Sequence, residues 1–515
     1  MKYHSTRNLG HYKTFEEVLV STYAPDGGLY VPEKVPILSD ETFHSMKDSS
    51  FPEVCAQILH LYSAIDIEKL RAMTKSSFAL FNDGIDPLPI TALGDSDVRV
   101  LDTSLGPTFA FKDIGQQMCG QLLNYVLGKQ NKKAKIVVET SGDTGPAAIY
   151  GVRGCSNVEI FCLYPQGRVS AVQELQMVTI QDENVHVYRT QGDTDEQASV
   201  LKELFRDEEF VRAQSICSVN SINWVRIAAQ SSYFVWSYLE LVRRGEVKFG
   251  APINYVIPTG AFGNAMGAFL AKRMGLPIGR IICATNANDI VHRTLTTGDM
   301  SMGVNVQVPI LLTSECIDCN VRTPHTFSEL LFRIEQTESP AMDIQFAYNL
   351  ERMLYFICNE NPDVVRPYMQ AVERQYSYIP GAVGAKLDGV VLRRIQEVFS
   401  SYSVSDAETL ATIKEVDEKH HMVLCPHSAT SVFAALHPFK EMSASTLTVC
   451  VLTAHPSKFE EAVQRAIGRD PDFPPAITAL RSMPHKFKTL DKRAPEPEMW
   501  RQDWIEILKA DIASV

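Results

Sequence analysis

The chain has 515 residues, with 49 lysines and arginines against 61 aspartates and glutamates, and a formal net charge of −12. Hydrophobic residues make up 45% and charged residues 21%, which excludes a disordered chain, a collagen and a small disulfide-rich protein. The acidic balance argues against nucleic-acid binding and against attachment to an anionic membrane surface.

The sequence predicts neither a membrane-spanning segment nor a secretory signal. No apolar run approaches the roughly 18–20 residues that span a bilayer. Residues 1–12 are polar from the start, so we expect no secretory leader. The 11 cysteines are scattered, mostly in apolar runs, which is typical of buried thiols in a reducing compartment. We therefore expect a cytoplasmic protein.

The length suggests about three units, at roughly 100–200 residues per domain. We expect an N-terminal domain over residues 1–92, a core of two α/β subdomains over 93–480 and a tail over 481–515. An irregular insert at about 300–338 interrupts the core. The tail ends in a predicted helix whose apolar face contains Trp504, Ile505, Leu508 and Ile512.

From about residue 97 the pattern alternates between strands and helices. Short β-branched runs predict strands at 135–138, 158–164, 185–189, 254–257 and 280–284. Helical patterns lie between them, at 146–152, 173–178, 195–205 and up to about 274. This alternation predicts a mainly parallel sheet with helices on both faces, and ligands bound beyond the carboxyl ends of its strands.

Two glycine-rich loops each follow a predicted strand and open a helix, at 141–145 and at 260–264. Backbone amides aimed by a helix N-terminus make an anion site, although ordinary tight turns have the same composition. The loop at 260–264 would hold a phosphate. The loop at 141–145 adds hydroxyls and a carboxylate. Neither has the spacing of a dinucleotide-binding or P-loop motif.

A lone lysine, Lys112, stands in the run Gly-Pro-Thr-Phe-Ala-Phe-Lys-Asp at 106–113. A lysine removed from water has a lowered pKa and can form a Schiff base, whereas a lysine taken alone is as readily a surface residue. A Schiff-base lysine and a separate phosphate loop on one α/β sheet are what pyridoxal phosphate requires. The combination predicts pyridoxal 5′-phosphate as the cofactor.

These blocks, together with Thr-Ala-His-Pro-Ser-Lys-Phe at 453–459, resemble the threonine synthase family, including its phospholyase branch. The resemblance begins at Ser-Thr-Arg, residues 5–7, and covers most of the chain. It implies a tryptophan-synthase-β-like, fold type II α/β enzyme with mainly parallel sheets. It also implies that residues 1–92 are the extra N-terminal domain and that 93–480 are the pyridoxal-phosphate-dependent core.

The resemblance also assigns candidate site residues. Lys112 matches the lysine that bonds covalently to the cofactor, and Thr453 matches the threonine beside the pyridine nitrogen. The remaining cofactor-binding positions are Gly260, Ala261, Phe262, Gly263 and Asn264. The positions implied for the substrate are Ser141, Asp143, Thr144, Arg168, Asn220, Ser221, Asn223 and Arg226.

The sequence departs from the family pattern at several positions. Leu105 replaces a histidine, Ala261 an asparagine and Asn264 an aspartate. The block Cys-Pro-His-Ser-Ala at 425–429 replaces Asp-Pro-His-Thr-Ala. His427 and His455 lie in family blocks near the cofactor, without an assigned role. The Leu105 change removes a possible acid or base close to Lys112.

The resemblance implies conversion of O-phospho-L-homoserine and water to L-threonine and phosphate. The alternative is a phospholyase that releases 2-oxobutyrate, ammonia and phosphate from phosphohomoserine or phosphothreonine. A non-catalytic binding module is disfavoured, because Lys112 and both anion loops are retained. The expected partner is a small phosphorylated amino acid, with no nucleic acid or membrane. No feature of the sequence indicates an oligomeric state.

One pair of cysteines, Cys316 and Cys319, has the spacing of a metal-binding motif, and His325 is close by. There is no second pair at zinc-ribbon spacing. We therefore expect no metal site.

Overall fold

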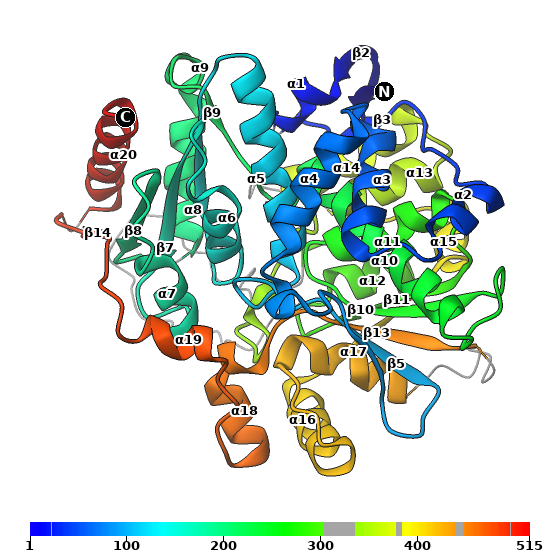
Figure 1. Ribbon diagram of the computed structural model, residues 1–515. Coiled ribbons are helices and arrows are strands. Elements are labelled where there is room, and N and C mark those ends of the chain that lie inside the picture. The colour runs from blue at the N-terminus through cyan, green and yellow to red at the C-terminus, as the bar shows by residue number, and fades with distance from the viewer. Residues whose placement is uncertain (22, 193, 303–334, 377–383, 438–445, 495) are drawn as a thin grey trace, which may run out of the picture.

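The computed structural model describes residues 1–515 except 22, 193, 303–334, 377–383, 438–445 and 495. Cys316, Cys319 and His325 lie outside the described residues. Two α/β subdomains lie side by side in Figure 1, one built around β6 to β8 and the other around β10, β11 and β13. The predicted mainly parallel α/β architecture is confirmed.

The larger subdomain contains a six-stranded sheet in the order β12-β11-β10-β13-β5-β4. All neighbours pair in parallel except β4 and β5. The strands are β4 (Ile90–Ala92), β5 (Val98–Asp102), β10 (Ile253–Pro258), β11 (Ile278–Thr285), β12 (Phe399–Ser403) and β13 (Thr448–Leu452).

Helices cover both faces of this sheet, which explains why β10 and β13 are buried and apolar along their length. One face packs against α16 (Asp406–His420) and α17 (Pro426–Leu436). The other packs against α10 (Trp224–Arg243) and α11 (Gly263–Arg273). Around them lie α12 (Ile290–Thr297), α13 (Leu350–Ile357), α14 (Pro362–Tyr376), α15 (Gly389–Gln396) and α18 (Glu460–Ile467).

The smaller subdomain contains a five-stranded parallel sheet in the order β14-β8-β7-β6-β9. Its strands are β6 (Ala134–Glu139), β7 (Val158–Pro165), β8 (Val185–Thr190), β9 (Ile216–Cys217) and β14 (Lys488–Leu490). One face packs against α5 (Lys112–Lys129), α6 (Thr144–Val152) and α7 (Ala171–Val178). The other packs against α8 (Thr194–Arg206) and α20 (Pro497–Ala513); the short helices α9 (Glu208–Ala213) and α19 (Pro475–Leu480) complete the subdomain.

The C-terminal segment is part of the smaller subdomain. Strand β14 extends the sheet beside β8, and α20 lies at the edge of the molecule in Figure 1. The predicted apolar face of this helix is buried, as the exposed fraction is 0% for Trp504, Leu508 and Ile512 and 4% for Ile505. The predicted tail therefore contributes a strand and a covering helix to the core.

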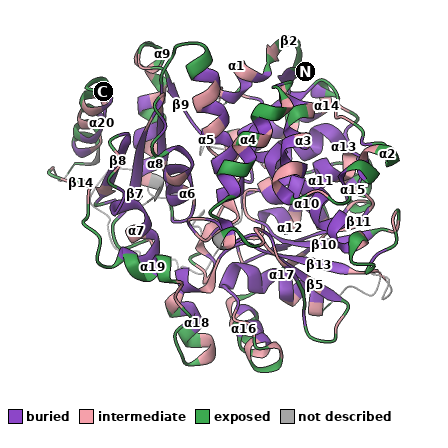
Figure 2. Ribbon diagram, in the orientation of Figure 1, coloured by how far each residue is buried: buried purple, intermediate pink, exposed green. Residues whose placement is uncertain are grey.

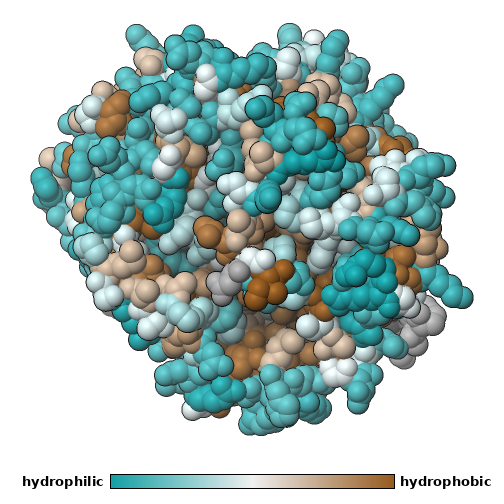
Figure 3. Space-filling view, in the orientation of Figure 1, coloured by the Kyte–Doolittle hydropathy of each residue, from teal (hydrophilic) through white to brown (hydrophobic). Residues whose placement is uncertain are grey.

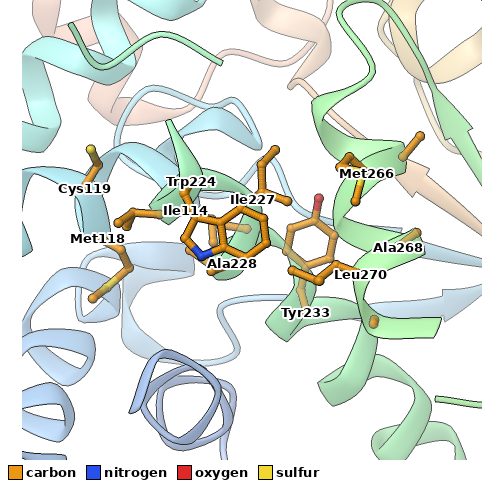
Figure 4. Close-up of a cluster of buried hydrophobic side chains, with 14 of the residues drawn as sticks. Ile114, Met118, Cys119, Trp224, Ile227, Ala228, Tyr233, Met266, Ala268 and Leu270 are labelled. Carbon is orange, nitrogen blue, oxygen red and sulfur yellow. The ribbon is translucent and has the colours of Figure 1, made fainter. Parts of the chain in front are cut away.

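A continuous apolar core joins the two subdomains. Figure 4 shows side chains of α5, α10 and α11 meeting, among them Met118, Trp224 and Met266. Figure 2 shows the sheets and α10 buried, with exposed residues on the outer helices. In the space-filling view hydrophilic residues dominate the rim, and hydrophobic ones gather near the centre (Figure 3).

The N-terminal segment packs on this core. It forms a small antiparallel sheet of β1 (Lys2–Ser5), β2 (Asn8–Thr14) and β3 (Tyr30–Pro32). It also forms the helices α1 (Phe15–Leu19), α2 (Asp40–Met46), α3 (Phe51–Ser63) and α4 (Ile67–Phe78). Arg7 donates to both Glu351 carboxylate oxygens, at 2.8 Å each, which fixes the N-terminal sheet to α13.

The described residues contain neither a membrane-crossing helix nor a cluster of metal-binding side chains. No helix there combines the length and the apolar composition needed to cross a membrane. No group of three histidine, cysteine or acidic side chains in the described part of the chain could hold a metal ion.

Candidate active site

Lys112 is the first residue of α5, at the junction of the two subdomains. Its side chain is 14% exposed, and its Nζ lies 3.9 Å from the Asp143 carboxylate. Burial lowers the pKa of Lys112 to about 8; repulsion by Arg226 and Lys458 acts in the same direction, and Asp143 opposes it. An amine with a pKa in this range is partly neutral near pH 8, and the Schiff-base role of Lys112 stays a prediction.

The loop that carries Lys112 is held by hydrogen bonds to its own helix. The Thr108 amide and hydroxyl donate to the two carboxylate oxygens of Asp113, at 2.8 and 2.6 Å. Asp113 is fully buried, and this burial raises the pKa of its carboxyl to about 6 despite the two hydrogen bonds. The loop is therefore a rigid support for Lys112.

A second segment, which follows β13, lies against this loop. The Phe111 amide donates to the Thr453 carbonyl at 2.8 Å, and Ala110 forms a bridge with Ala454. Thr453 thus lies beside Lys112, although the two are far apart in the sequence. The Thr453 hydroxyl is buried and has no hydrogen-bond partner in the structure.

The loop between β6 and α6 brings Asp143 to the site. The Thr140 hydroxyl accepts hydrogen bonds from the amides of Gly142 and Gly145, at 3.0 and 2.9 Å. Gly142 has φ of 151°, and a Cβ there would lie 2.6 Å from the Gln173 amide, so glycine is required. The turn aims Asp143 inward and leaves Ser141 exposed and Thr144 half-buried.

The loop between β10 and α11 has the geometry of an anion site. Phe262 adopts the left-handed conformation, with φ of 64°, and Gly263 begins the 11-residue helix α11. Asn264 accepts a hydrogen bond from the Tyr233 hydroxyl, while its Nδ2 is buried without a partner. Asn349 donates to the Ala261 carbonyl at 3.3 Å and so holds the loop from outside.

These groups fit pyridoxal phosphate. The N-terminus of α11 and the unpartnered Asn264 amide can hold a phosphate, and the unpartnered Thr453 hydroxyl can hydrogen-bond a ring nitrogen. Lys112 supplies the amine. Buried polar side-chain atoms are normally hydrogen-bonded, so the Asn264 and Thr453 atoms without partners are available to a bound cofactor.

The residues implied for the substrate lie in different environments. Arg226 is buried beside Lys112; one Nη donates to the Val219 carbonyl at 3.1 Å and its Nε has no partner. Burial lowers the pKa of Arg226 to about 10, and no described carboxylate forms an ion pair with it. Arg168 is exposed on the loop after β7, and Asn220 and Ser221 are half-buried before α10.

Asn223 has a structural role. Its side-chain oxygen accepts from the Val225 amide at 3.0 Å and caps α10, while its Nδ2 donates to the Leu19 carbonyl at 3.0 Å. One donor and one acceptor of the amide are thus used within the fold, and contact of Asn223 with the substrate stays a prediction.

Lys458 was not among the predicted site residues. Its side chain is completely buried, and its Nζ lies 2.7 Å from Asp143 Oδ1. Gln173, also not predicted, donates to the same oxygen at 2.9 Å. Burial alone would raise the pKa of the Asp143 carboxyl, but Lys458 and Lys112 hold it well below its usual range. The only sequence signal for Lys458 was its place in the block at 453–459.

His427 is buried at the same site. Its Nε2 accepts a hydrogen bond from the Ala341 amide at 3.0 Å, and its Nδ1 has no partner. Burial lowers the pKa of His427 to about 4, with Asp143 opposing the shift. The ring is therefore neutral with its proton on Nδ1, and it offers an unused donor in the site.

A pocket of about 410 Å³ is lined by residues that precede the Lys112 loop and by residues that follow β13. Its lining includes Ser104, Leu105, Ser428, Ala454 and His455. Leu105, which replaces the family histidine, thus contributes an apolar wall. An imidazole at this position would have added a titratable group.

Comparisons with known proteins agree with this geometry. Three family profiles match: "Threonine synthase N terminus" over residues 2–78, "Pyridoxal-phosphate dependent enzyme" over 84–319 and "Threonine synthase, C-terminal" over 428–498. Threonine synthase of Schizosaccharomyces pombe is 34% identical over 495 residues, covering 92% of this chain and 90% of that protein. Threonine synthase-like 2 of Rattus norvegicus is also 34% identical, covering 100% of this chain and 97% of its own.

Solved structures give the same result. A pyridoxal-phosphate-bound threonine synthase from Brucella melitensis has a TM-score of 0.85 and 33% identity, covering 98% of this chain and 99% of its own. Threonine synthase from yeast has a TM-score of 0.83 and 31% identity, covering 98% of both chains. The fold and the cofactor predicted from the sequence are confirmed.

Proposed function

Since the chain belongs to the pyridoxal-phosphate-dependent threonine synthase family, we propose that it converts O-phospho-L-homoserine and water to L-threonine and phosphate. The observation that carries the proposal is a buried arginine without a carboxylate partner beside the candidate cofactor lysine. Arginine binds phosphate and carboxylate through paired N–H donors. Arg226 is thus suited to hold one anionic group of such a substrate close to Lys112.

The cofactor, when bound, supplies an aldehyde that bonds an amine and a ring that accepts the electrons left by a departing proton. The chain supplies proton transfer. Lys112, with a pKa of about 8, can take a proton from substrate carbon and return it later. Asp143, which stays ionised, faces the amine and stabilises its protonated form.

Other residues would bind and orient the cofactor and the substrate. The amides at the start of α11 and the Asn264 side chain would hold the cofactor phosphate, and the neutral Thr453 hydroxyl would hydrogen-bond the ring nitrogen without protonating it. Ser141 and Thr144 present hydroxyls on the loop beside Asp143, and Asn220 and Ser221 lie on the side of Arg226. Arg168, from the exposed loop after β7, is a second candidate for the leaving phosphate.

The second candidate is the phospholyase that releases 2-oxobutyrate, ammonia and phosphate from phosphohomoserine or phosphothreonine. The replacement of the family histidine by Leu105, directly before the Lys112 loop in the sequence, favours it, because an apolar side chain cannot assist the proton transfers that accompany addition of water. Both reactions share every group described above and differ in what happens after phosphate leaves.

Product analysis tests the proposal. The protein is purified with pyridoxal phosphate and given O-phospho-L-homoserine, then O-phospho-L-threonine, while phosphate, threonine and 2-oxobutyrate are measured together. Phosphate matched by threonine supports the synthase; phosphate matched by 2-oxobutyrate supports the phospholyase. Release of no phosphate, with an absorbance band that Lys112→Ala removes, would indicate a protein that binds the cofactor without this turnover.

A matched variant examines the role of Leu105. If this side chain decides the outcome, Leu105→His shifts the products of phosphohomoserine toward threonine. An unchanged ratio of threonine to 2-oxobutyrate would mean that Leu105 does not decide between the two products.

A further inference from the structure

Two lysines, the buried Lys458 and the partly exposed Lys112, share one carboxylate in the site. Asp143 Oδ1 lies 2.7 Å from the Lys458 Nζ, and Asp143 Oδ2 lies 3.9 Å from the Lys112 Nζ. The exposed fractions of the Lys458 and Asp143 side chains are 0% and 4%. A carboxylate and an ammonium in such a position are stable only when paired, so the closer lysine is the main partner of Asp143 and Lys112 is the second.

Lys458 also holds the loop that carries Lys112. Its Nζ donates to the Thr108 carbonyl at 2.8 Å, and the Thr108 amide and hydroxyl bind Asp113 at the start of α5. One ammonium therefore bridges the β6–α6 loop to the Lys112 loop. The bridge fixes the position of Asp143 relative to the Lys112 amine.

We propose that Lys458 is a positioning residue: its ammonium holds the Asp143 carboxylate back from a closer pair with Lys112 and ties it to the loop from which Lys112 projects. The inference deepens the proposed function, because it concerns the amine on which that function depends. Lys458 acts through Asp143 and is not itself a proton carrier, since its Nζ is occupied by the carboxylate and the Thr108 carbonyl.

The charged groups around Lys458 and Asp143 determine in which direction the Lys112 pKa changes when Lys458 is replaced. Lys112 is influenced by Asp143, Arg226 and Lys458; Asp143 is also influenced by His427. Asp113 and His455 interact with Lys458 from the other side. Removing the Lys458 charge takes a repelling cation away from Lys112 and leaves Asp143 to pair with Lys112 alone. Both effects raise the pKa of the Lys112 amine.

The test measures the Lys112 amine itself, in the full-length protein freed of cofactor. Labelling with acetic anhydride across a pH series, quantified by mass spectrometry of the Lys112 peptide, gives its titration. In Lys458→Met we expect about tenfold less labelling of Lys112 at pH 7.5, equivalent to a rise of about one pKa unit. Uptake of pyridoxal phosphate, followed by absorbance, should slow by a similar factor.

Two control variants distinguish a positioning role of Lys458 from nonspecific destabilisation by the substitution. Lys458→Arg keeps the charge and should restore most of the Lys112 labelling. Lys419→Met removes a lysine from an exposed helix ion pair with Glu415 and should change nothing. A Lys112 titration that is unchanged in folded Lys458→Met, or equally shifted in Lys458→Arg, would overturn the proposal.

A double variant decides the matter if Lys458→Met does not fold. Asp143→Asn with Lys458→Met removes both buried charges, and Asp143 has the larger influence on Lys112 of the two. We expect folded protein whose Lys112 labels more readily than in the wild type; labelling equal to wild type would count against the inference. None of these readouts needs turnover, so the proposed reaction can fail while this inference stands.

Discussion

At Arg226 a charge has been buried without a carboxylate to neutralise it. Such a group is retained when a ligand supplies the missing anion. We predict that Arg226→Met raises KM for the phosphorylated substrate by about tenfold to a hundredfold, because a hydrogen bond to a charged group contributes about 1.5–3 kcal/mol. Steady-state kinetics measure it, with exposed Arg168→Met compared in parallel. An unchanged KM in Arg226→Met would mean that Arg226 holds neither anionic group of the substrate.

Asp113 gives a pH dependence of stability whose sign can be derived. The folded pKa of about 6 lies above the ordinary value of about 3.9, so the native state binds the proton more tightly than the unfolded chain. This contribution is complete below pH ~4 and is lost as the pH rises through about 6. Because Asp113 is fully buried, solvent does not screen the shift.

The corresponding variant should remove that dependence. Between pH ~4.5 and 7 the wild type should lose about 2 kcal/mol that Asp113→Asn does not lose. Thermal unfolding of both proteins across this range measures the difference. A stability gap between them that does not change with pH would contradict the assignment.

At the scale of elements, α5 and α6 set the distance between the two loops of the site. Lys112 begins α5, and Asp143 directly precedes α6. The helices touch through backbone: a Cβ on Gly151 would lie 2.5 Å from the Gln116 carbonyl, and one on Gly120 would lie 1.9 Å from the Gly151 carbonyl. Only glycine permits this approach.

A methyl group at this contact should therefore lower the turnover rate as well as the stability of the protein. We predict that Gly151→Ala destabilises the protein by about 1–3 kcal/mol through overpacking. It should also lower kcat by up to about 100-fold by separating Asp143 from Lys112. The matched control is Gly128→Ala on α5, whose Cβ would meet only the end of the Asn157 side chain. Equal kcat in both variants would refute the helix-spacing argument.

Several elements could be predicted because their signals are local. The strands predicted at 135–138 and 158–164 are observed as β6 and β7, since β-branched runs bounded by turns identify buried parallel strands. No strand was assigned at 448–452, although β13 leads directly into Thr453. Its position between β10 and β5 depends on sheet order, which periodicity does not encode.

The residues of the candidate site also differ in whether their role can be predicted from a local sequence motif. Lys112 and the loop at 260–264 could be identified because each motif carries its chemistry in consecutive residues. Lys458 could not, because its role exists only opposite Asp143, which lies far away in the sequence and is brought close by the fold. Asn223 lay in a family block and is used as a helix cap, a role that sequence similarity alone does not distinguish from substrate binding.

For the whole molecule, a buried ion pair joins the first residues to the core. Arg7 binds Glu351 through two hydrogen bonds, and the exposed fractions of the two side chains are 4% and 3%. Arg7→Met would leave the Glu351 carboxylate buried without its partner, which costs about 3–5 kcal/mol. Denaturant unfolding should show this loss.

An exposed pair provides the comparison. Lys13→Met, which breaks the surface pair with Glu17, should cost less than about 1 kcal/mol. Similar losses for Arg7→Met and Lys13→Met would mean that the N-terminal sheet is not anchored through Glu351.

The contact between Lys458 and the Thr108 carbonyl closes a chain segment of 350 residues. At ribosomal rates of about 5–20 residues per second, roughly 20–70 s pass between synthesis of the first side of this contact and synthesis of the second. Until then the nascent polypeptide carries a reactive lysine without the segment that completes its surroundings. We therefore expect maturation of the enzyme to be a late event of translation, and a chain that terminates before residue 453 to be inactive however well its earlier sheets have folded.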